Sequence, residues 1–441
     1  MKQSTVTRKE FIRQSAWVLA GAAFLPGGLF ASTGLKGAEM KQQKYTLKNV
    51  RLETGFVYEE EQVVATRTEL FCIDIENGII KNVRANQPDA QAIDARGMIM
   101  LPAFKDMHIH LDKTLYGDAW RAVEQRKGGV KGMIALEQEI LPGMLKHSTQ
   151  KAEKLIELLQ SKGTAFARSH VNIEPTSGLE SLRHLQTALE HKKKVFGAEL
   201  VAFPQHGVFY TDAAPYMKEA AQAGVDFIGG VDPFTIDGGI EKTMDFTVQL
   251  ALDYHKGIDI HLHETGASGL KTVEYLIRKV NENPSLKGKT YLSHCFVLGK
   301  LNKIKQQEMA EKLAEAQIGI ISTIPFAGLI MPIPTLMEHG VTVMTGNDSI
   351  IDHWSTFGTG SVLHKVNVAA QVYGHTTEFG LSRMLKLATA GPLPLSDKGV
   401  QQWPKAGDTA DLVFLEASCS AEAIARLSPV TSLIYQGNIV F

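Results

Sequence analysis

Apolar segments of strand length alternate with helical patterns through the middle of this 441-residue chain. The strand candidates are residues 104–109, 164–171, 197–203, 227–231, 258–262, 290–293, 318–322 and 341–345. Stretches with the periodicity of amphipathic helices separate them, at 151–161, 179–193, 213–223, 240–255, 270–283 and 306–316. Strands that alternate with helices in this way predict an α/β fold, here a (β/α)8 TIM-type barrel.

Both ends of the chain have the pattern of short β-strands instead. Strand candidates cover residues 45–52, 69–75, 79–83, 410–415, 430–435 and 439–441. The dipeptide Asn77-Gly78 marks a tight turn between two of them. We therefore expect a small β-sandwich domain built from residues 39–101 and 400–441, with the barrel in residues 102–399 between its two parts.

Residues 1–38 have the composition of a secretory signal. A basic segment with Arg8-Lys9 precedes an uncharged, Gly- and Ala-rich run from Ala16 to Ala31. The basic segment resembles the twin-arginine export motif, with Arg8-Lys9 in place of two arginines. Export to the periplasm is the expectation, and a cytoplasmic protein with a buried N-terminal helix is the alternative. No other segment is apolar enough for a membrane span, so none is expected in the mature chain.

Charge and cysteine usage exclude other classes of protein. The formal net charge is −1 and the body of the chain has no basic cluster, so nothing indicates nucleic-acid binding. The three cysteines lie far apart, which argues against a disulfide framework and against a cysteine-based zinc site. The Gly- and Met-rich segment 128–147 is expected to be irregular, as a lid or as a contact in a homo-oligomer.

Metal-ligating side chains occur where the strand candidates end. His108 and His110 end the first, and the alternation of side chains along a strand places both imidazoles on one face. A lone pair of histidines at this spacing is more often a structural polar pair. Here, however, other strand ends carry Gln205-His206, His261 with His263 and Glu264, Ser293-His294, and Asn347-Asp348-Ser349. A barrel brings the carboxyl ends of its strands to one rim.

Three histidines and one aspartate from these groups suit one divalent ion, with zinc, iron and manganese as the candidates. Such a metal lowers the pKa of a bound water towards ~7. Glu264 lies three residues after His261, so it is the natural carboxylate to move protons without being a ligand.

Together these motifs resemble those of the amidohydrolase superfamily, and within it the bacterial cytosine deaminase group. The resemblance covers nearly the whole mature chain. Its segments are 106–112 (DMHIHLD), 201–205 (VAFPQ), 259–261 (DIH) with Glu264, 292–294 (LSH), 346–348 (GND), 352–354 (DHW) and 406–413 (AGDTADLV). The resemblance implies one metal ion held by His108, His110, His261 and Asp348. It also implies catalytic roles for Glu264 in proton transfer, for Asp348, and for His294 in stabilising the attacking water or the oxyanion.

The same resemblance bears on the substrate. It implies that Gln205 hydrogen-bonds the amide edge of a heterocycle, and Trp354 and Ser349 are expected to line the pocket. Cytosine deaminase carries a second carboxylate where this chain has Ser349, and it lacks a histidine at the position of His263, so a substrate other than cytosine is favoured. The fourth strand lacks the lysine that bridges two metals in many relatives, which implies a mononuclear site.

The expected function is therefore that of a metal-dependent hydrolytic deaminase of a cyclic amidine, such as an aminopyrimidine or aminotriazine. Metal-bound hydroxide would attack the amidine carbon, and ammonia or an amine would leave. Two alternatives stay open: a cyclic amide hydrolase of the same superfamily, and an exported binding protein on a catalytically inactive barrel. Among other polar residues, Lys113 is interpreted as a surface lysine, His263 as a supporting residue, and Asp232 as a candidate substrate contact.

Overall fold

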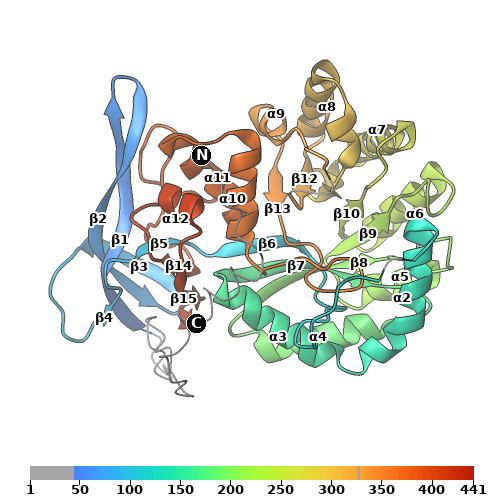
Figure 1. Cartoon of the computed structure of the whole chain (residues 1–441), viewed down its shortest axis with the longest axis horizontal. Helices are drawn as coiled ribbons and strands as arrows, with labels where there is room; N and C mark the ends of the chain where they lie inside the picture. The colour runs from blue at the N-terminus through green and yellow to red at the C-terminus, as the bar shows by residue number, and fades with distance from the viewer. Residues whose placement is uncertain (1–43, 125, 325–327) are drawn as a thin grey trace, which may run out of the picture.

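The computed structural model describes residues 44–124, 126–324 and 328–441, which form a barrel and a separate sheet (Figure 1). The export signal predicted in residues 1–38 lies outside the described residues. Among the described residues, no helix combines the length and the apolar character that crossing a membrane requires.

Within the described residues, eight parallel strands form the barrel, each hydrogen-bonded to the next in chain order. They are β6 (Phe104–Ile109), β7 (Thr164–Asn172), β8 (Gly197–Phe203), β9 (Phe227–Val231), β10 (Gly257–His261), β11 (Thr290–Ser293), β12 (Ile318–Ser322) and β13 (Val343–Thr345). The two ends of this sheet meet where Ile109, at the end of β6, forms a parallel bridge with Asp348, just after β13. The predicted barrel is confirmed.

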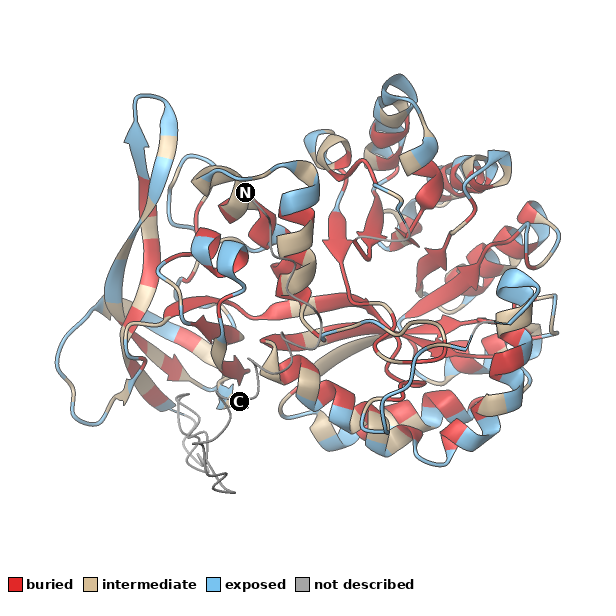
Figure 2. Cartoon of the chain, viewed as in Figure 1, coloured by how far each residue is buried: buried red, intermediate tan, exposed pale blue. Residues whose placement is uncertain are grey.

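Helices cover the outside of the barrel and connect its strands (Figure 1). They are α3 (Ser148–Ser161), α4 (Glu180–Lys192), α5 (Ala214–Gln222), α6 (Ile240–Asp253), α7 (Ala267–Glu282), α8 (Lys303–Glu315), α9 (Ile333–Glu338), α10 (Val362–Tyr373) and α11 (Glu378–Thr389), with short 3-10 turns at Pro284–Leu286 and Phe296–Lys300. Their apolar faces point inward: in α3, for example, Leu155, Ile156 and Leu159 are fully buried. Figure 2 shows the result, with buried strands inside and exposed helix faces outside.

The expectation that residues 128–147 are irregular is wrong, because α2 (Gly129–Leu145) occupies this segment. Its glycines and the internal Pro142 masked the helical pattern. The pattern is nevertheless present, since Ile134, Glu137 and Leu141 are buried at spacings of three and four residues. Glu137 therefore places a carboxylate in the middle of the buried face of α2.

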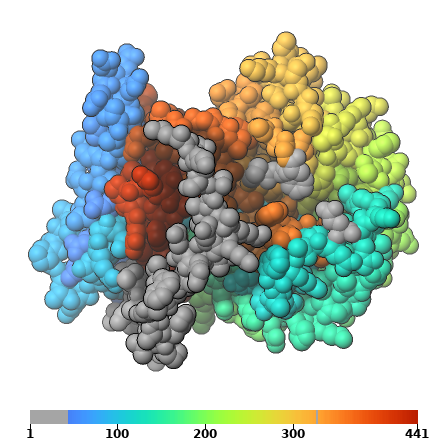
Figure 3. All heavy atoms as spheres, viewed as in Figure 1, coloured from blue at the N-terminus to red at the C-terminus, as the bar shows by residue number. Residues whose placement is uncertain are grey.

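The second sheet combines both ends of the chain, which lie side by side in the space-filling view of Figure 3, blue beside red. Its order is β16–β15–β14–β5–β1–β2–β3, and β4 also pairs with β1. The bounds are β1 (Lys44–Glu59), β2 (Gln62–Glu76), β3 (Ile79–Ala85), β4 (Ile93–Asp94), β5 (Ile99–Pro102), β14 (Leu412–Leu415), β15 (Val430–Tyr435) and β16 (Asn438–Ile439); α12 (Ser420–Arg426) joins β14 to β15.

This sheet has a core of its own, in which Leu47, Ile73 and Leu412 are fully buried. Most of its strand pairs are antiparallel. Asn77 and Gly78 form the predicted turn, with φ values of +53° and +76°. The second β-domain built from both chain ends is thus confirmed, while the boundaries given for the domains stay a prediction.

Candidate metal centre and active site

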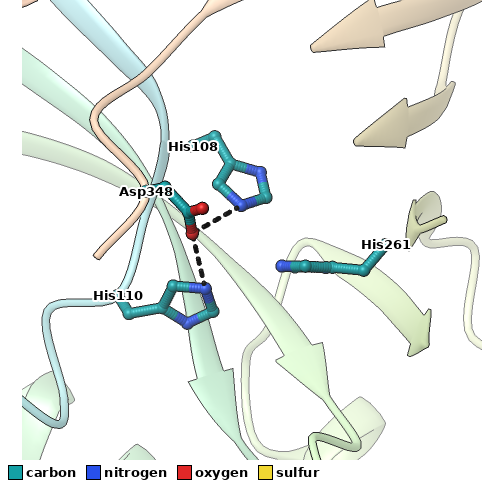
Figure 4. Close-up of side chains that lie close together, drawn as sticks. All are labelled: His108, His110, His261 and Asp348. Carbon is teal, nitrogen blue, oxygen red and sulfur yellow. Dashed lines mark ion pairs between the residues drawn. The ribbon is translucent and has the colours of Figure 1, made fainter. Parts of the chain in front are cut away.

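Four side chains converge at the carboxyl end of the barrel: His108, His110, His261 and Asp348 (Figure 4). Each offers one ligand atom, and these atoms all lie within 4.8 Å of one another. Asp348 Oδ1 lies 3.4 Å from His108 Nε2 and 3.4 Å from His110 Nε2. Ligand atoms about 2.0–2.1 Å from one tetrahedral ion lie roughly 3.3–3.4 Å apart, so these distances suit a single zinc-sized ion.

The backbone that closes the barrel also fixes three of these four side chains. Asp348 N–H donates to the carbonyl of His108 at 2.7 Å, and His110 N–H donates to the carbonyl of Asp348 at 3.3 Å. Asp348 has a φ of +65°, a left-handed conformation that is uncommon for a residue with a side chain. Such conformations persist where the surrounding structure holds them, frequently at functional sites.

A chain of hydrogen bonds sets which nitrogen of His108 faces the cluster. Ser293 Oγ donates to Asp259 Oδ1 at 2.6 Å, and Arg168 holds the other oxygen of Asp259 at 3.2 Å. The hydroxyl proton of Ser293 is thus committed, so its oxygen accepts from His108 Nδ1 at 2.8 Å. The lone pair of His108 is then on Nε2, the nitrogen that faces Asp348.

The protonation of the cluster also suits a cation. Burial lowers the pKa of His110 to about 4, and burial together with the neighbouring His170 lowers the pKa of His261 well below 6.5. Burial alone would raise the pKa of Asp348, but the close imidazoles of His108 and His110 hold that pKa well below its usual range. Neutral imidazoles and an ionised carboxylate are the forms that bind metal.

Buried ring nitrogens without hydrogen-bond partners also indicate a cation site. Neither ring nitrogen of the buried His261 has a hydrogen-bond partner among the described residues, and Phe203 stacks on its ring with centroids 4.0 Å apart. Unsatisfied buried nitrogens are costly unless something else binds them. The donor set therefore fits a divalent metal. His170, whose ring centroid is 4.2 Å from that of His108, lies outside the group of four.

Glu264 is anchored by one oxygen and leaves the other unengaged. Its Oε1 accepts from the backbone N–H of Phe234 at 3.1 Å and of Thr235 at 2.8 Å. Its Oε2 is buried and has no hydrogen-bond partner among the described residues. Glu264 does not belong to the ligand group, so its second oxygen is available for a proton.

Two further histidines lie beside the cluster. The ring of His294 is 4.8 Å from that of His108 and 4.5 Å from that of His263, and its Nε2 lies 4.0 Å from Asp348 Oδ2. His263 Nδ1 lies 2.8 Å from Asp232 Oδ2. Asp232 Oδ1 accepts from the backbone N–H of His263 and of Glu264. Asp232 therefore holds these two residues in place, and its interpretation as a candidate substrate contact stays a prediction.

The remaining predicted residues lie on the other side of the mouth. Ser349 is buried directly after Asp348. Gln205 Oε1 accepts from Lys113 Nζ at 2.6 Å, and Trp354 Nε1 donates to Glu137 Oε2 at 3.0 Å. The interpretation of Lys113 as a surface lysine is wrong, because only 1% of it is exposed. The burial of the Lys113 ammonium is explained by Glu137, whose carboxylate supplies the opposite charge that a buried ammonium needs.

Asp259, Lys113 and Glu137 hold other residues of the site in place, and the sequence could have predicted this role only for Asp259. Asp259 is two residues before His261 in β10, so its position on the same face of the strand could have been predicted. The pairing of Lys113 with Glu137 could not be predicted, because the burial of each charge depends on the other across a long loop.

Comparison with known proteins places this site in a family. A family model described as "Amidohydrolase family" matches residues 119–441. The chain belongs to the amidohydrolase family. A general hydrolase role comes with that membership, and the superfamily uses divalent metals, in agreement with the four-residue cluster.

Two sequences and one crystal structure illustrate which known proteins this amidohydrolase is similar to. The uncharacterized protein YahJ of Escherichia coli K12 is 46% identical over 456 residues, covering 100% of this chain and 99% of YahJ. N-isopropylammelide isopropyl amidohydrolase of Pseudomonas sp. strain ADP is 24% identical over 360 residues, 79% of this chain and 87% of the relative. The crystal structure of N-isopropylammelide isopropylaminohydrolase from Burkholderia multivorans superposes with a TM-score of 0.78 at 25% identity, covering 90% of this chain and 98% of that one.

Proposed function

We propose that this amidohydrolase is a metal-dependent hydrolytic deaminase of a cyclic amidine, an aminopyrimidine- or aminotriazine-like heterocycle. The observation that carries the proposal is Glu264, whose Oε2 is buried without a partner among the described residues while two backbone N–H groups hold Oε1. Binding alone gives no reason to bury an unpaired carboxylate oxygen beside a metal-ligand set, whereas proton transfer requires one. The names of the two isopropylammelide hydrolases support a ring that loses an amine.

His108, His110, His261 and Asp348 would hold the metal, which when bound supplies Lewis-acid activation of water. The oxygen of a water molecule adds to the amidine carbon, and Glu264 Oε2 takes the released proton and gives it to a ring nitrogen. Glu264 then carries the remaining hydroxyl proton to the exocyclic nitrogen. The carbon–nitrogen bond breaks, a carbonyl forms, and ammonia or an amine leaves.

Two residues assist these steps. Asp232 fixes the backbone N–H of Glu264 at 3.2 Å and so keeps the carboxylate on the same side as the cluster. His294 lies next to Asp348, where its imidazole can contact the oxygen that becomes the carbonyl. Gln205 and Trp354 would contact the ring at the opposite side of the mouth.

The test is product analysis with purified protein loaded with zinc, with manganese, or anaerobically with ferrous iron. A panel of aminopyrimidines, N-alkylaminotriazines and pterins is incubated with each form, and free ammonia and amines are measured, with chelator-treated protein as the control. We expect metal-dependent release from at least one class of ring. Ring opening without amine release would favour the cyclic amide hydrolase. No release from any compound that demonstrably binds would favour a binding protein.

A further inference from the structure

Glu137 ties together the loops at one half of the barrel mouth. It projects from α2, between β6 and β7, and is fully buried. Polar groups surround its two oxygens: Lys113 Nζ at 3.4 Å, Asn172 Nδ2 at 2.6 Å, Trp354 Nε1 at 3.0 Å, His206 Nε2 at 3.4 Å and His353 Nε2 at 3.3 Å. These side chains come from the end of β7 and from the segments after β6, β8 and β13, four neighbouring strands of the barrel.

The charge of Glu137 is maintained by its neighbours. Burial would raise the pKa of this carboxyl, but the Lys113 ammonium, followed by His353, lowers it well below its usual range. A buried pair of this kind is held together because removing either charge leaves the other uncompensated.

Lys113 has no donor left for a substrate. Its ammonium carries three protons and accepts none. Three oxygens surround it within hydrogen-bond distance: Gln205 Oε1 at 2.6 Å, Asn172 Oδ1 at 3.2 Å and Glu137 Oε1 at 3.4 Å. It also lies 5.8 Å from the ring centroids of Phe203 and of Trp354, which close the space around it. Lys113 therefore acts through the side chains that it holds.

The side chain held most closely is Gln205. Because an ammonium only donates, the oxygen of the Gln205 amide must face Lys113, and the amide nitrogen must point away. No described residue accepts a hydrogen bond from that nitrogen, and Gln205 retains 8% exposure. The two N–H groups of Gln205 thus have no acceptor among the described residues, which leaves them able to donate to a bound ring.

We propose that Glu137 and Lys113 are positioning residues that lock Gln205 as a hydrogen-bond donor, so that the site selects rings with an oxo group, rather than an amino group, at that edge. This inference takes only one thing from the proposed function, namely that the ligand is an aminopyrimidine- or aminotriazine-like ring. It makes α2 part of the active site, because its carboxylate sets the orientation of an amide that belongs to another loop.

The test compares two rings that differ at one edge. Cytosine has an oxo group at carbon 2 and 2,4-diaminopyrimidine has an amino group there; ammeline and melamine form the equivalent triazine pair. Dissociation constants are measured by calorimetry on metal-loaded Glu264→Gln protein, and ammonia release is measured separately on the wild type. We expect the oxo member of a pair to bind at least about tenfold more tightly, the effect of one buried hydrogen bond lost or gained.

Variants identify the source of that preference. In Gln205→Glu the side chain becomes an acceptor beside Lys113, so the preference for the oxo ring should fall or reverse. In Lys113→Met the amide of Gln205 can rotate, so the preference should fall several-fold while the metal content is unchanged. The matched control is Lys192→Met, which removes a lysine from a surface pair with Glu157 at 2.6 Å and should leave the preference as in the wild type.

The outcomes separate the two proposals. An oxo preference that Lys113→Met and Gln205→Glu both reduce supports the positioning role. Equal binding of the two rings, or a preference that survives both substitutions, overturns it, even if ammonia is released and the proposed function stands. An oxo preference that responds to the variants without ammonia release from any ring leaves the positioning role intact and overturns the deaminase.

Discussion

Gly346 lies where the barrel closes around the candidate metal centre, and Gly346→Ala tests how closely the two are coupled. A Cβ at this position would lie 2.4 Å from the backbone nitrogen of His108, 2.4 Å from its carbonyl oxygen and 2.6 Å from Asp106 Oδ1. The backbone atoms cannot move aside as the end of a flexible side chain could. Asp106 is also fixed, because it accepts from the backbone N–H of Asn347 at 3.0 Å.

Inserting a methyl group into such a space costs about 1–3 kcal/mol of folding free energy. The backbone of His108 is the part that must shift, so we expect metal affinity to fall about 10–100-fold, as it does when the support of a ligand is disturbed. Metal affinity is measured by competition with a chromophoric chelator, and stability by thermal unfolding of the metal-loaded protein.

The matched control is Gly143→Ala in α2, where a Cβ would meet nothing within 4 Å. That substitution should leave metal binding unchanged and raise stability by about 0.5–1 kcal/mol. If Gly346→Ala bound metal as tightly as the wild type and unfolded at the same temperature, the close packing of Gly346 against the backbone of His108 would not be what positions His108.

Three further predictions concern the metal, the second domain and the N-terminus. Chelation should lower the unfolding temperature and readdition of zinc restore it, since a ligand at 100 times its dissociation constant stabilises by about 2.7 kcal/mol; an unchanged midpoint would argue against a bound ion. Hydrogen bonding to Arg84 lowers the pKa of Asp74 from 3.8 to about 2, so its contribution is fully present above about pH 4 and is lost as the pH falls through about 2. Asp74→Asn should cost about 1 kcal/mol at pH 7, a value reduced for solvent exposure, and progressively less as the pH falls from about 4 through about 2. Residues 1–38 should carry a fused reporter to the periplasm, and a reporter that stays cytoplasmic would refute the proposed export.

Much of the fold could be predicted because each barrel strand carries its own signal. Segments 197–203, 227–231 and 318–322 are short apolar runs between amphipathic helices, and the structure has strands with the same bounds. His108 and Asp348 could be grouped for the same reason, since the topology of a barrel brings strand ends together whatever their separation in sequence.

The Lys113–Glu137 pair could not be found in this way. A lysine and a glutamate outside the strands usually lie in solvent, and only the three-dimensional meeting of α2 with the loop after β6 makes both buried. The burial of each charge depends on the other, so neither residue alone carries the information. The helical spacing of Ile134, Glu137 and Leu141 was the one local indication, and the glycines and Pro142 around it obscured the helix.

The central claim is that Glu264 moves protons beside a metal that it does not bind, and Glu264→Gln tests it most directly. The amide can still accept from Phe234 and Thr235 through its oxygen, so the local structure should be retained. We predict about one metal ion per chain, as in the wild type, and turnover lower by about 10²–10⁴-fold. Asp348→Asn should instead lose the metal together with the activity. Loss of metal from Glu264→Gln as readily as from Asp348→Asn, or turnover equal to that of the wild type, would contradict the account.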